Sequence, residues 1–177
     1  MDDEYKCSIV DIKNIDPAKS SKLLKFQQTK IKLMTDFESY KKYVDEHGID
    51  TQIIYIYACG FCDIFSMYLH EKLNYNLSYS SGMLGGTKVP VHSFCVYEDE
   101  YFDINGKHTN VSILENPYWN SLTVEGTIDV NEHNRIWKGP DDHFENHKKF
   151  VEYIYDLWLK RIKNNVKKIK LTEFVGD

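Results

Sequence analysis

Apolar side chains recur with a helical period in two segments of the chain. One stripe runs through residues 61–73 and ends near Asn74, and the other runs through residues 144–162. A spacing of three to four residues is typical of a helix that buries one face. The pattern therefore predicts two amphipathic helices, one in the first half of the chain and a longer one near its end.

A third, shorter helix is predicted from a capping signal. Thr35 and Glu38 form the S/T-x-x-E pattern of a capping box, and apolar residues continue the helical period to about His47, where Gly48 follows. Upstream of this helix, residues 1–34 mix charged residues with two short apolar clusters. They predict only a strand or loop followed by a weak helix.

Strands are predicted between these helices. Residues 52–57 form a run rich in isoleucine and tyrosine, typical of a short buried strand, and residues 77–83 read as extended. Residues 91–97 and 101–104 form the two arms of a hairpin. We therefore expect an α+β fold with an antiparallel β-sheet. We treat residues 1–177 as a single domain with a core at about residues 52–108.

Composition restricts the classes of function. The 177 residues are 42% hydrophobic and include 13 Tyr, which indicates a folded domain. A net charge of −5 gives no electrostatic basis for binding nucleic acid. The four cysteines are too few for a disulfide scaffold. The start is acidic where a signal peptide would be basic, and no apolar run of membrane-spanning length follows, so we expect neither a signal peptide nor a membrane span. We expect a cytoplasmic protein that needs no metal or cofactor.

The chemistry of the chain is concentrated in three residues. Cys62 falls in the first turn of its predicted helix, where the helix dipole favours a thiolate, and Gly60 lets the preceding backbone turn sharply. His92 and Asp103 lie on the two arms of the hairpin. A thiol, an imidazole and an orienting carboxylate are the set that cysteine catalysis requires. The backbone N–H of Cys62 is the predicted oxyanion donor, and the second donor is undetermined.

The hairpin geometry makes a specific prediction for the second and third residues. With an even-numbered turn at residues 97–99, His92 and Asp103 project from one face and lie directly opposite or diagonal to each other. That spacing allows a hydrogen bond from Nδ1–H of His92 to the carboxylate. Phe94 and Val96 share this face, which we expect to pack onto the helix that carries Cys62.

These motifs resemble the transglutaminase-like and papain-like cysteine hydrolases, including compact members among phage and bacterial effector-type proteins. The matching stretches are residues 60–70, 92–96 and 101–106. The resemblance implies a papain-like core in which Cys62 is the nucleophile, His92 the general base and acid, and Asp103 the orienting carboxylate. It also implies a protein or peptide substrate. The glutamine expected just ahead of the cysteine is missing, since Gln52 lies ten residues upstream.

Three other interpretations stay open. Cys59 and Cys62 form a C-x-x-C pair after a predicted strand, as in a thioredoxin-like oxidoreductase. A zinc site using Cys59, Cys62 and His92 or Cys95 lacks the second close pair of ligands that structural zinc takes. A protein-binding inhibitor without catalysis would suit the aromatic content.

The segment after the hairpin is the predicted wall or lid of the substrate cleft. Residues 109–142 carry several turn signals together with Trp119 and Trp137, which we predict to bind substrate. The alternative is that both tryptophans fill the core. The histidines beyond the hairpin are predicted to lie on the surface, with His108 as a substitute base: His108, His133, His143 and His147.

Overall fold

A computed structural model describes residues 17–109, 122–137 and 142–164. In these ranges the chain forms six helices and one sheet of five strands. The helices are α1 (Pro17–Thr35), α2 (Phe37–His47), α3 (Thr51–Ala58), α4 (Cys62–Leu73), α5 (Val130–Trp137) and α6 (His143–Lys163). The strands are β1 (Asn76–Leu84), β2 (Thr87–Tyr97), β3 (Glu100–Asp103), β4 (Gly106–His108) and β5 (Thr123–Val124).

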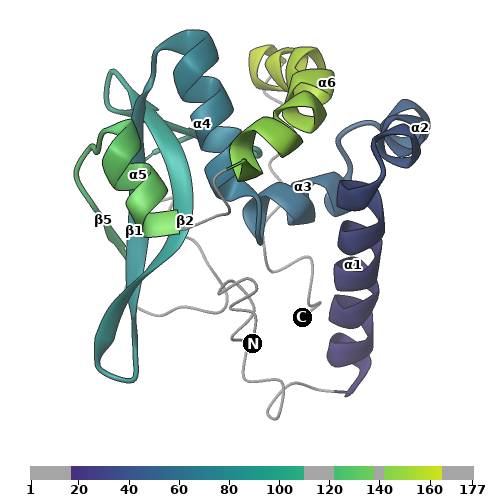
Figure 1. Ribbon diagram of the computed structural model, residues 1–177, viewed down its shortest axis with the longest axis horizontal. Helices are drawn as coiled ribbons and strands as arrows, with labels where there is room; N and C mark the ends of the chain where they lie inside the picture. Colours follow the sequence, from purple (N-terminus) through teal and green to yellow (C-terminus); the bar gives the residue numbers. More distant parts are fainter. Residues whose placement is uncertain (1–16, 110–121, 138–141, 165–177) are drawn as a thin grey trace.

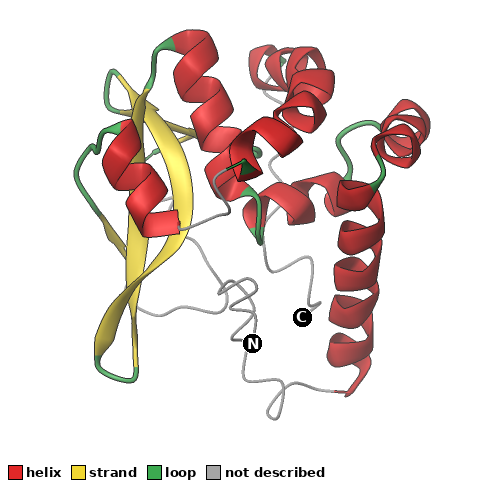
Figure 2. Ribbon diagram, viewed as in Figure 1, coloured by secondary structure: helices red, strands yellow, loops and turns green. Residues whose placement is uncertain are grey.

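The predicted α+β class with an antiparallel sheet is confirmed. The strand order is β4-β3-β2-β1-β5, and every paired neighbour is antiparallel. Figure 1 places the sheet on one side, with α3, α4 and α6 beside it and α1 and α2 further away. Figure 2 shows the same separation of strands from helices. Strands β1 to β4 thus form a meander, β5 is added at the β1 edge, and most of the helical mass lies on one face of the sheet.

The helix that carries Cys62 ends where the sequence predicts. Asn74 adopts a left-handed conformation with φ 56°, and its N–H caps the His70 carbonyl, which turns the chain into β1. The second and third strands are joined by a two-residue turn at Glu98 and Asp99, whose φ values are 47° and 61°. Two left-handed residues in succession match the twist of the strands that they connect. The even-numbered turn of the predicted hairpin is therefore confirmed.

The predicted strand at residues 52–57 is wrong, because this segment is the helix α3. Asp50 caps the helix by accepting a hydrogen bond from the Ile53 N–H at 3.0 Å. The residues of α3 from Gln52 to Ala58 are all buried. Burial on every side removes the amphipathic period, and a short apolar run without a period does not distinguish a strand from a helix.

The capping residue of α2 also differs from the prediction. Asp36 is the N-cap and accepts a hydrogen bond from the Glu38 N–H at 3.1 Å, whereas Thr35 ends the preceding helix. The end of α2 at Gly48, where φ is 64°, agrees with the prediction. The long terminal helix is confirmed as α6, with Val151, Ile154 and Trp158 buried on one face.

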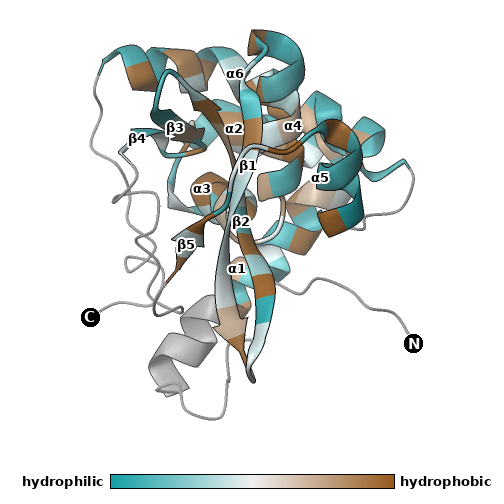
Figure 3. Cartoon of the chain, turned by 90° about the vertical axis from the view of Figure 1, so that its left-hand side faces the viewer, coloured by the Kyte–Doolittle hydropathy of each residue, from teal (hydrophilic) through white to brown (hydrophobic). Residues whose placement is uncertain are grey.

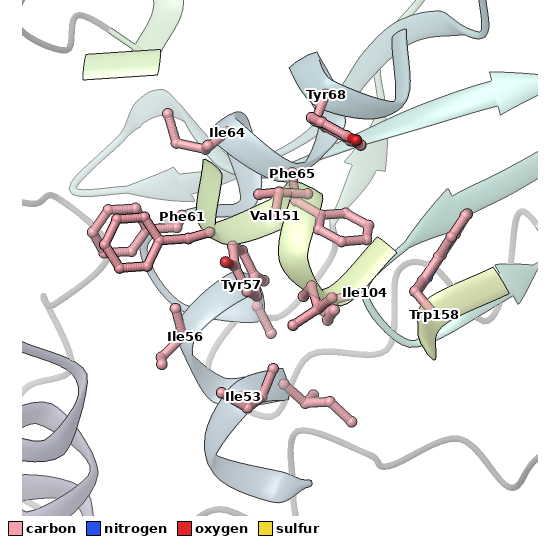
Figure 4. Close-up of a cluster of buried hydrophobic side chains, with 14 of the residues drawn as sticks. Ile53, Ile56, Tyr57, Phe61, Ile64, Phe65, Tyr68, Ile104, Val151 and Trp158 are labelled. Atoms are coloured by element: carbon pink, nitrogen blue, oxygen red, sulfur yellow. The ribbon is translucent and has the colours of Figure 1, made fainter. Parts of the chain in front are cut away.

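The hydrophobic core lies where α3, α4 and α6 meet the helix-facing side of the sheet. Figure 4 shows its centre, with Phe65 of α4 near Tyr57 of α3, and with Trp158 of α6 on the far side of Ile104 from Tyr57. The Phe65 and Trp158 rings pack edge to face, with their centroids 5.6 Å apart. Figure 3 shows how apolar and polar positions are distributed over the elements. This core fixes the start of α4 relative to the central strands.

Among the described residues, no helix is by itself both long enough and apolar enough to cross a membrane. Taken together, α3 and α4 reach the length and composition of one span, but the two helices meet at a bend of 88°.

Candidate functional site

Cys62 is the first residue of α4, as predicted. Phe61 precedes it at the N-cap position and makes no side-chain capping hydrogen bond. The first N–H groups of any helix lack an acceptor within the helix, so this end carries partial positive charge. The Cys62 side chain is buried, with 2% of the residue exposed. Burial raises the pKa of a thiol, so a thiolate here needs its surroundings to outweigh burial.

The loop before Cys62 turns the chain by 88° between two core helices. The Cys59 N–H donates to the Tyr55 carbonyl at 2.9 Å, and the Phe61 N–H donates to the Ile56 carbonyl at 3.1 Å. Gly60 between them has a φ of 147°, which L side chains rarely adopt. No disulfide joins the cysteines of the described ranges, which are Cys59, Cys62 and Cys95.

The C-x-x-C pair follows a helix and not a strand. The redox alternative rests on a strand before Cys59, and α3 occupies that place. The sheet is antiparallel throughout the described part of the chain, so the βαβ pattern that accompanies redox C-x-x-C motifs is missing from it. The structure thus removes the strand on which that interpretation depends.

The helix α4 lies along β2 and runs in the same direction. The Ser66 and Ser93 hydroxyls are 2.6 Å apart, and the Cys95 thiol donates to the Ser66 carbonyl at 3.1 Å. Cys62 precedes Ser66 by one helical turn, and Val91 precedes Ser93 by one strand repeat. By this spacing Cys62 lies about level with Val91 along β2.

These contacts correct one prediction. Side chains alternate along a strand, and the face of β2 that touches α4 carries Ser93 and Cys95. His92 and Phe94 belong to the other face, contrary to the expectation that their face packs onto the helix. A bulge interrupts the alternation next to His92, because Ser80 pairs with His92 whereas Ser81 pairs with Pro90. Bulges of this kind change the direction of neighbouring side chains.

The predicted hydrogen bond between His92 and Asp103 is present. The register pairs Cys95 with Phe102, which places His92 diagonally across from Asp103. The distance from His92 Nε2 to Asp103 Oδ2 is 3.0 Å, and both residues are buried. The ring nitrogen differs from the prediction, since Nε2 and not Nδ1 meets the carboxylate.

Asp103 also binds a second histidine, which the sequence did not place correctly. His108 Nε2 lies 2.7 Å from Asp103 Oδ1, and the Asn105 N–H donates to the same oxygen at 2.7 Å. The His108 side chain is 8% exposed, so the prediction of a surface position is wrong. The register explains the contact, because β4 pairs Tyr101 with His108 and so returns His108 to the Asp103 face.

These contacts fix the protonation states of His92, Asp103 and His108. Burial by itself raises the pKa of Asp103, but the charge and hydrogen bond of His108 and those of His92 outweigh it and hold this pKa well below its usual range. Asp103 is therefore a carboxylate, and a carboxylate only accepts hydrogen bonds. Both histidines must donate from Nε2–H. In its neutral form His92 then carries a lone pair on Nδ1, the atom that a general base needs.

Three buried polar atoms near this pair lack a hydrogen-bond partner in the described structure. They are His92 Nδ1, Ser80 Oγ and Asn105 Oδ1. Ser80 lies directly opposite His92 in the register of β1 and β2, so its hydroxyl shares the face of the imidazole. Buried polar groups are normally satisfied, and clusters of exceptions mark functional sites.

Of the two tryptophans predicted to bind substrate, the structure describes one. Trp119 lies outside the described residues. Trp137 is the last residue of α5 and is half-buried, with its ring centroid 6.3 Å from that of His133. Its contact with substrate stays a prediction. The tryptophan that fills the core beneath the sheet is Trp158, which donates from Nε1 to the Asp103 carbonyl oxygen at 2.8 Å.

The other three histidines that were predicted to lie on the surface are buried or partly buried: His133, His143 and His147. His133 is buried, and its Nε2 lies 2.9 Å from the Ser93 hydroxyl. Burial lowers the pKa of His133 to about 4, so it is neutral at physiological pH. His143 and His147 of α6 are partly buried, and their rings stack near Phe61 with centroid distances of 5.6 Å and 5.0 Å. The described residues contain no group of three or more His, Cys, Asp or Glu that would hold a metal ion.

Comparison of the chain with protein-family models, with curated proteins and with solved structures found no match.

Proposed function

We propose that the protein is a cysteine-dependent hydrolase that transfers an acyl group from an amide bond of a protein or peptide. Cys62 is the nucleophile, His92 the general base and acid, and Asp103 the orienting carboxylate. The observation that carries this proposal is the His92–Asp103 hydrogen bond, which leaves His92 Nδ1 as a buried nitrogen without a partner among the described residues. The His92 side chain belongs to the face of β2 opposite to the one that contacts α4, so the proposal requires the bulge beside His92 to turn Nδ1 toward Cys62.

The chain order supports the same proposal. The nucleophile begins a helix, the base lies on the second strand after that helix, and the carboxylate ends the third. Antiparallel pairing of β2 and β3 brings the base and the carboxylate together. We propose that this arrangement is a papain-like or transglutaminase-like core, consistent with the motifs in the sequence.

The reaction would proceed in two steps that share one proton carrier. His92 Nδ1 takes the proton of the Cys62 thiol, and the thiolate attacks the amide carbonyl carbon. The backbone N–H of Cys62 stabilises the oxyanion, and the His92 imidazolium gives its proton to the leaving amine as the carbon–nitrogen bond breaks. A thioester remains on Cys62. Water then attacks it, His92 accepts the water proton, and the carboxylic acid leaves as the thiol is restored.

The His–Asp–His cluster suits this role. The Asp103 carboxylate stabilises the imidazolium that forms on His92 in each step. His108 occupies the other carboxylate oxygen, so that Asp103 cannot rotate away from His92 without losing two hydrogen bonds. Trp158 fixes the backbone at the same residue through its hydrogen bond to the Asp103 carbonyl oxygen. The carboxylate is thus positioned from both sides.

A second candidate uses the same histidine and aspartate with a different nucleophile. Ser80 shares the sheet face of His92 and Asp103, and its hydroxyl is fully buried without a hydrogen-bond partner in the described part of the chain. A serine, a histidine and an aspartate form the corresponding set for serine catalysis. This candidate lacks the helix terminus that accompanies Cys62.

Covalent labelling separates the candidates without a known substrate. The folded protein is treated at pH 6.5 with limiting iodoacetamide or with a fluorophosphonate, and the modified residue is mapped by mass spectrometry. We expect iodoacetamide to modify Cys62 before Cys59. Cys95 is the matched control, because it is buried in the core and burial raises its pKa.

The other outcomes are equally informative. Fluorophosphonate on Ser80, abolished by His92→Gln, would assign the serine nucleophile. Preferential alkylation of Cys59, or a reversible Cys59–Cys62 disulfide, would support redox chemistry. Equal inertness of Cys62 and Cys95 would overturn the proposal of a cysteine nucleophile and leave a binding protein as the remaining interpretation.

A further inference from the structure

Three polar side chains are buried together where α4, β2 and α5 meet. Ser66 of α4 and Ser93 of β2 are each 1% exposed, and His133 of α5 is 2% exposed. The two hydroxyl oxygens are 2.6 Å apart, and His133 Nε2 lies 2.9 Å from Ser93 Oγ and 3.3 Å from Ser66 Oγ. Each of these side chains is thus within hydrogen-bonding distance of the other two. We call Ser66, Ser93 and His133 the serine–histidine cluster.

The protons of the cluster form one directed chain of hydrogen bonds. The Ser66 hydroxyl lies 3.0 Å from the Asp63 carbonyl oxygen, which can only accept, so Ser66 donates to it. Ser66 has no second proton for Ser93, so the Ser93 hydroxyl is the donor between the two serines. His133 must then donate from Nε2–H to Ser93 Oγ. The chain runs from α5 through β2 to α4 and ends on the backbone of Asp63, the residue after Cys62.

The charge of the imidazole agrees with this chain. Burial lowers the pKa of His133 to about 4, and the nearby His70 of α4 acts in the same direction. The ring is therefore neutral at physiological pH and carries a single proton, which the chain places on Nε2. Neither this ring nor the two hydroxyl groups change their protonation between pH 5 and pH 9.

The cluster replaces apolar contacts with hydrogen bonds at a helix–sheet interface. Alanine at positions 66 and 93 would occupy nearly the same volume and would bury no hydroxyl group. An apolar interface allows a helix to shift along a strand, whereas hydrogen bonds of fixed direction hold one register. Ser66 contacts β2 twice, because its carbonyl oxygen also accepts from the Cys95 thiol at 3.1 Å. These contacts fix how far α4 lies along β2.

The cluster also connects the two proposed reacting residues through regular elements. Ser66 follows Cys62 by one turn of α4, and Ser93 is the residue after His92 in β2. We propose that Ser66, Ser93 and His133 are positioning residues, which set the register of α4 along β2 and so place Cys62 for proton transfer to His92. This inference rests on the proposed function, since it assumes that Cys62 is the nucleophile and His92 its base. A misplacement of about 1 Å in an active site can slow a reaction about 100-fold.

A double-mutant cycle on the alkylation of Cys62 tests the inference. Rate constants with iodoacetamide are measured by mass mapping between pH 5 and pH 9 for the wild type, Ser93→Ala, His92→Gln and the double variant. Ser93→Ala should raise the midpoint by about one pH unit and slow alkylation at pH 6.5 about tenfold, because a displaced imidazole stabilises the thiolate less. In the His92→Gln background the same substitution should leave the midpoint unchanged, since no base is left to misalign.

Further variants separate positioning from stability. Ser78→Ala is the matched control, because Ser78 is also a buried serine of a strand and its hydroxyl donates to the Glu125 carbonyl oxygen at 2.8 Å. It should lower the melting temperature about as much as Ser93→Ala but leave the midpoint at the wild-type value. His133→Gln keeps an N–H donor for Ser93 and should stay near the wild type, whereas His133→Leu should behave like Ser93→Ala.

Ser66→Ala is a second route to the same result if Ser93→Ala does not fold. It leaves the contact between Ser93 and His133 in place, removes the hydroxyl that joins α4 to β2, and should raise the midpoint in the same direction. Thermal denaturation of each variant reports the structural cost separately from the midpoint.

Failure of this inference differs from failure of the proposed function. If wild-type Cys62 titrates well below about 8.5, the value of a free cysteine, and Ser93→Ala and Ser66→Ala leave that midpoint unchanged, the positioning role is wrong and the nucleophile stands. An equal rise of the midpoint in Ser78→Ala, or an equal effect of Ser93→Ala with and without His92, would also overturn the positioning role. If wild-type Cys62 itself titrates at or above about 8.5, the proposed function fails.

Discussion

Asp103 has the most demanding environment of any single residue in the site. Its two carboxylate oxygens accept three hydrogen bonds, from His92, His108 and the Asn105 N–H. An asparagine at this position offers one acceptor oxygen and an N–H₂ group that only donates. One of the two histidines would then face a donor and would have to change its tautomer. The carboxylate is thus required both for charge and for hydrogen-bond geometry.

We therefore predict two effects of Asp103→Asn. The free energy of unfolding should fall by about 1–3 kcal/mol, because a buried donor loses its acceptor. The alkylation rate of Cys62 at pH 6.5 should fall at least about tenfold, because His92 loses the tautomer that accepts a proton on Nδ1. Chemical denaturation and mass mapping measure the two effects.

Asp99→Asn is the control for this substitution, since Asp99 lies exposed in the turn of the same hairpin. It should change neither quantity. If Asp103→Asn lowered stability but left the alkylation rate at the wild-type value, Asp103 would be a structural residue only.

The contact between the first turns of α4 and α6 is built from two neutral groups. Asp63 Oδ2 and His143 Nε2 are 3.8 Å apart. Burial raises the pKa of Asp63 to about 7, whereas burial and the neighbouring His147 lower the pKa of His143 to about 4. Between these values both groups are mostly uncharged. The contact is therefore not an ion pair at neutral pH, despite its complementary residue types.

This arrangement predicts how stability depends on pH. The unfolded chain ionises Asp63 near its ordinary value of 3.8, while the folded protein retains the proton up to about pH 7. Folding thus binds a proton in this window, and stability falls as pH rises through it. Asp63→Asn removes the free-energy cost of burying an ionisable carboxyl group. Its amide oxygen still accepts hydrogen bonds from the backbone at the start of α4. The variant should gain up to about 4 kcal/mol over the wild type between pH 4 and pH 8.

Urea denaturation at a series of pH values measures this difference. Asp156→Asn serves as the control, because Asp156 is an exposed residue of α6. A stability difference between Asp63→Asn and the wild type that stays constant from pH 4 to pH 8 would contradict the assigned pKa.

The helix α3 shows why a short apolar run can predict the wrong type of element. Its isoleucines and tyrosines favour a strand locally, but the segment is enclosed on all sides, and its backbone begins at the Asp50 cap. The signal that would have corrected the prediction is Asp50 itself, an N-cap residue directly before the apolar run. By contrast, α6 buries one face, so its period predicted it well. The helix α4 is buried throughout residues 62–69, but its apolar side chains still follow the helical spacing that predicted it.

Across the whole molecule, the sequence predicted the local chemistry of the site better than its surroundings. The His92–Asp103 hydrogen bond followed from strand alternation and an even-numbered turn, both of which are local. His108 and Ser80 joined the site through β4 and β1, respectively. Their positions depend on pairing and packing between distant segments, which no local pattern records. The face of β2 that meets α4 depends on packing in the same way.

The central claim is that His92 activates the Cys62 thiol, and its most direct test is the alkylation rate of Cys62 in His92→Gln. Glutamine keeps a hydrogen-bond donor for Asp103 but cannot accept the thiol proton. His108→Gln is the matched control on the other carboxylate oxygen, and Cys95 is the internal reference for opening of the fold.

If His92 activates the Cys62 thiol, wild-type Cys62 reacts with a midpoint well below about pH 8.5, and His92→Gln raises this midpoint and slows the reaction at pH 6.5 by at least about tenfold. His108→Gln should have a smaller effect, and Cys95 should stay unreactive in all three proteins. An unchanged Cys62 profile in His92→Gln, or a larger loss in His108→Gln than in His92→Gln, would show that His92 does not activate Cys62.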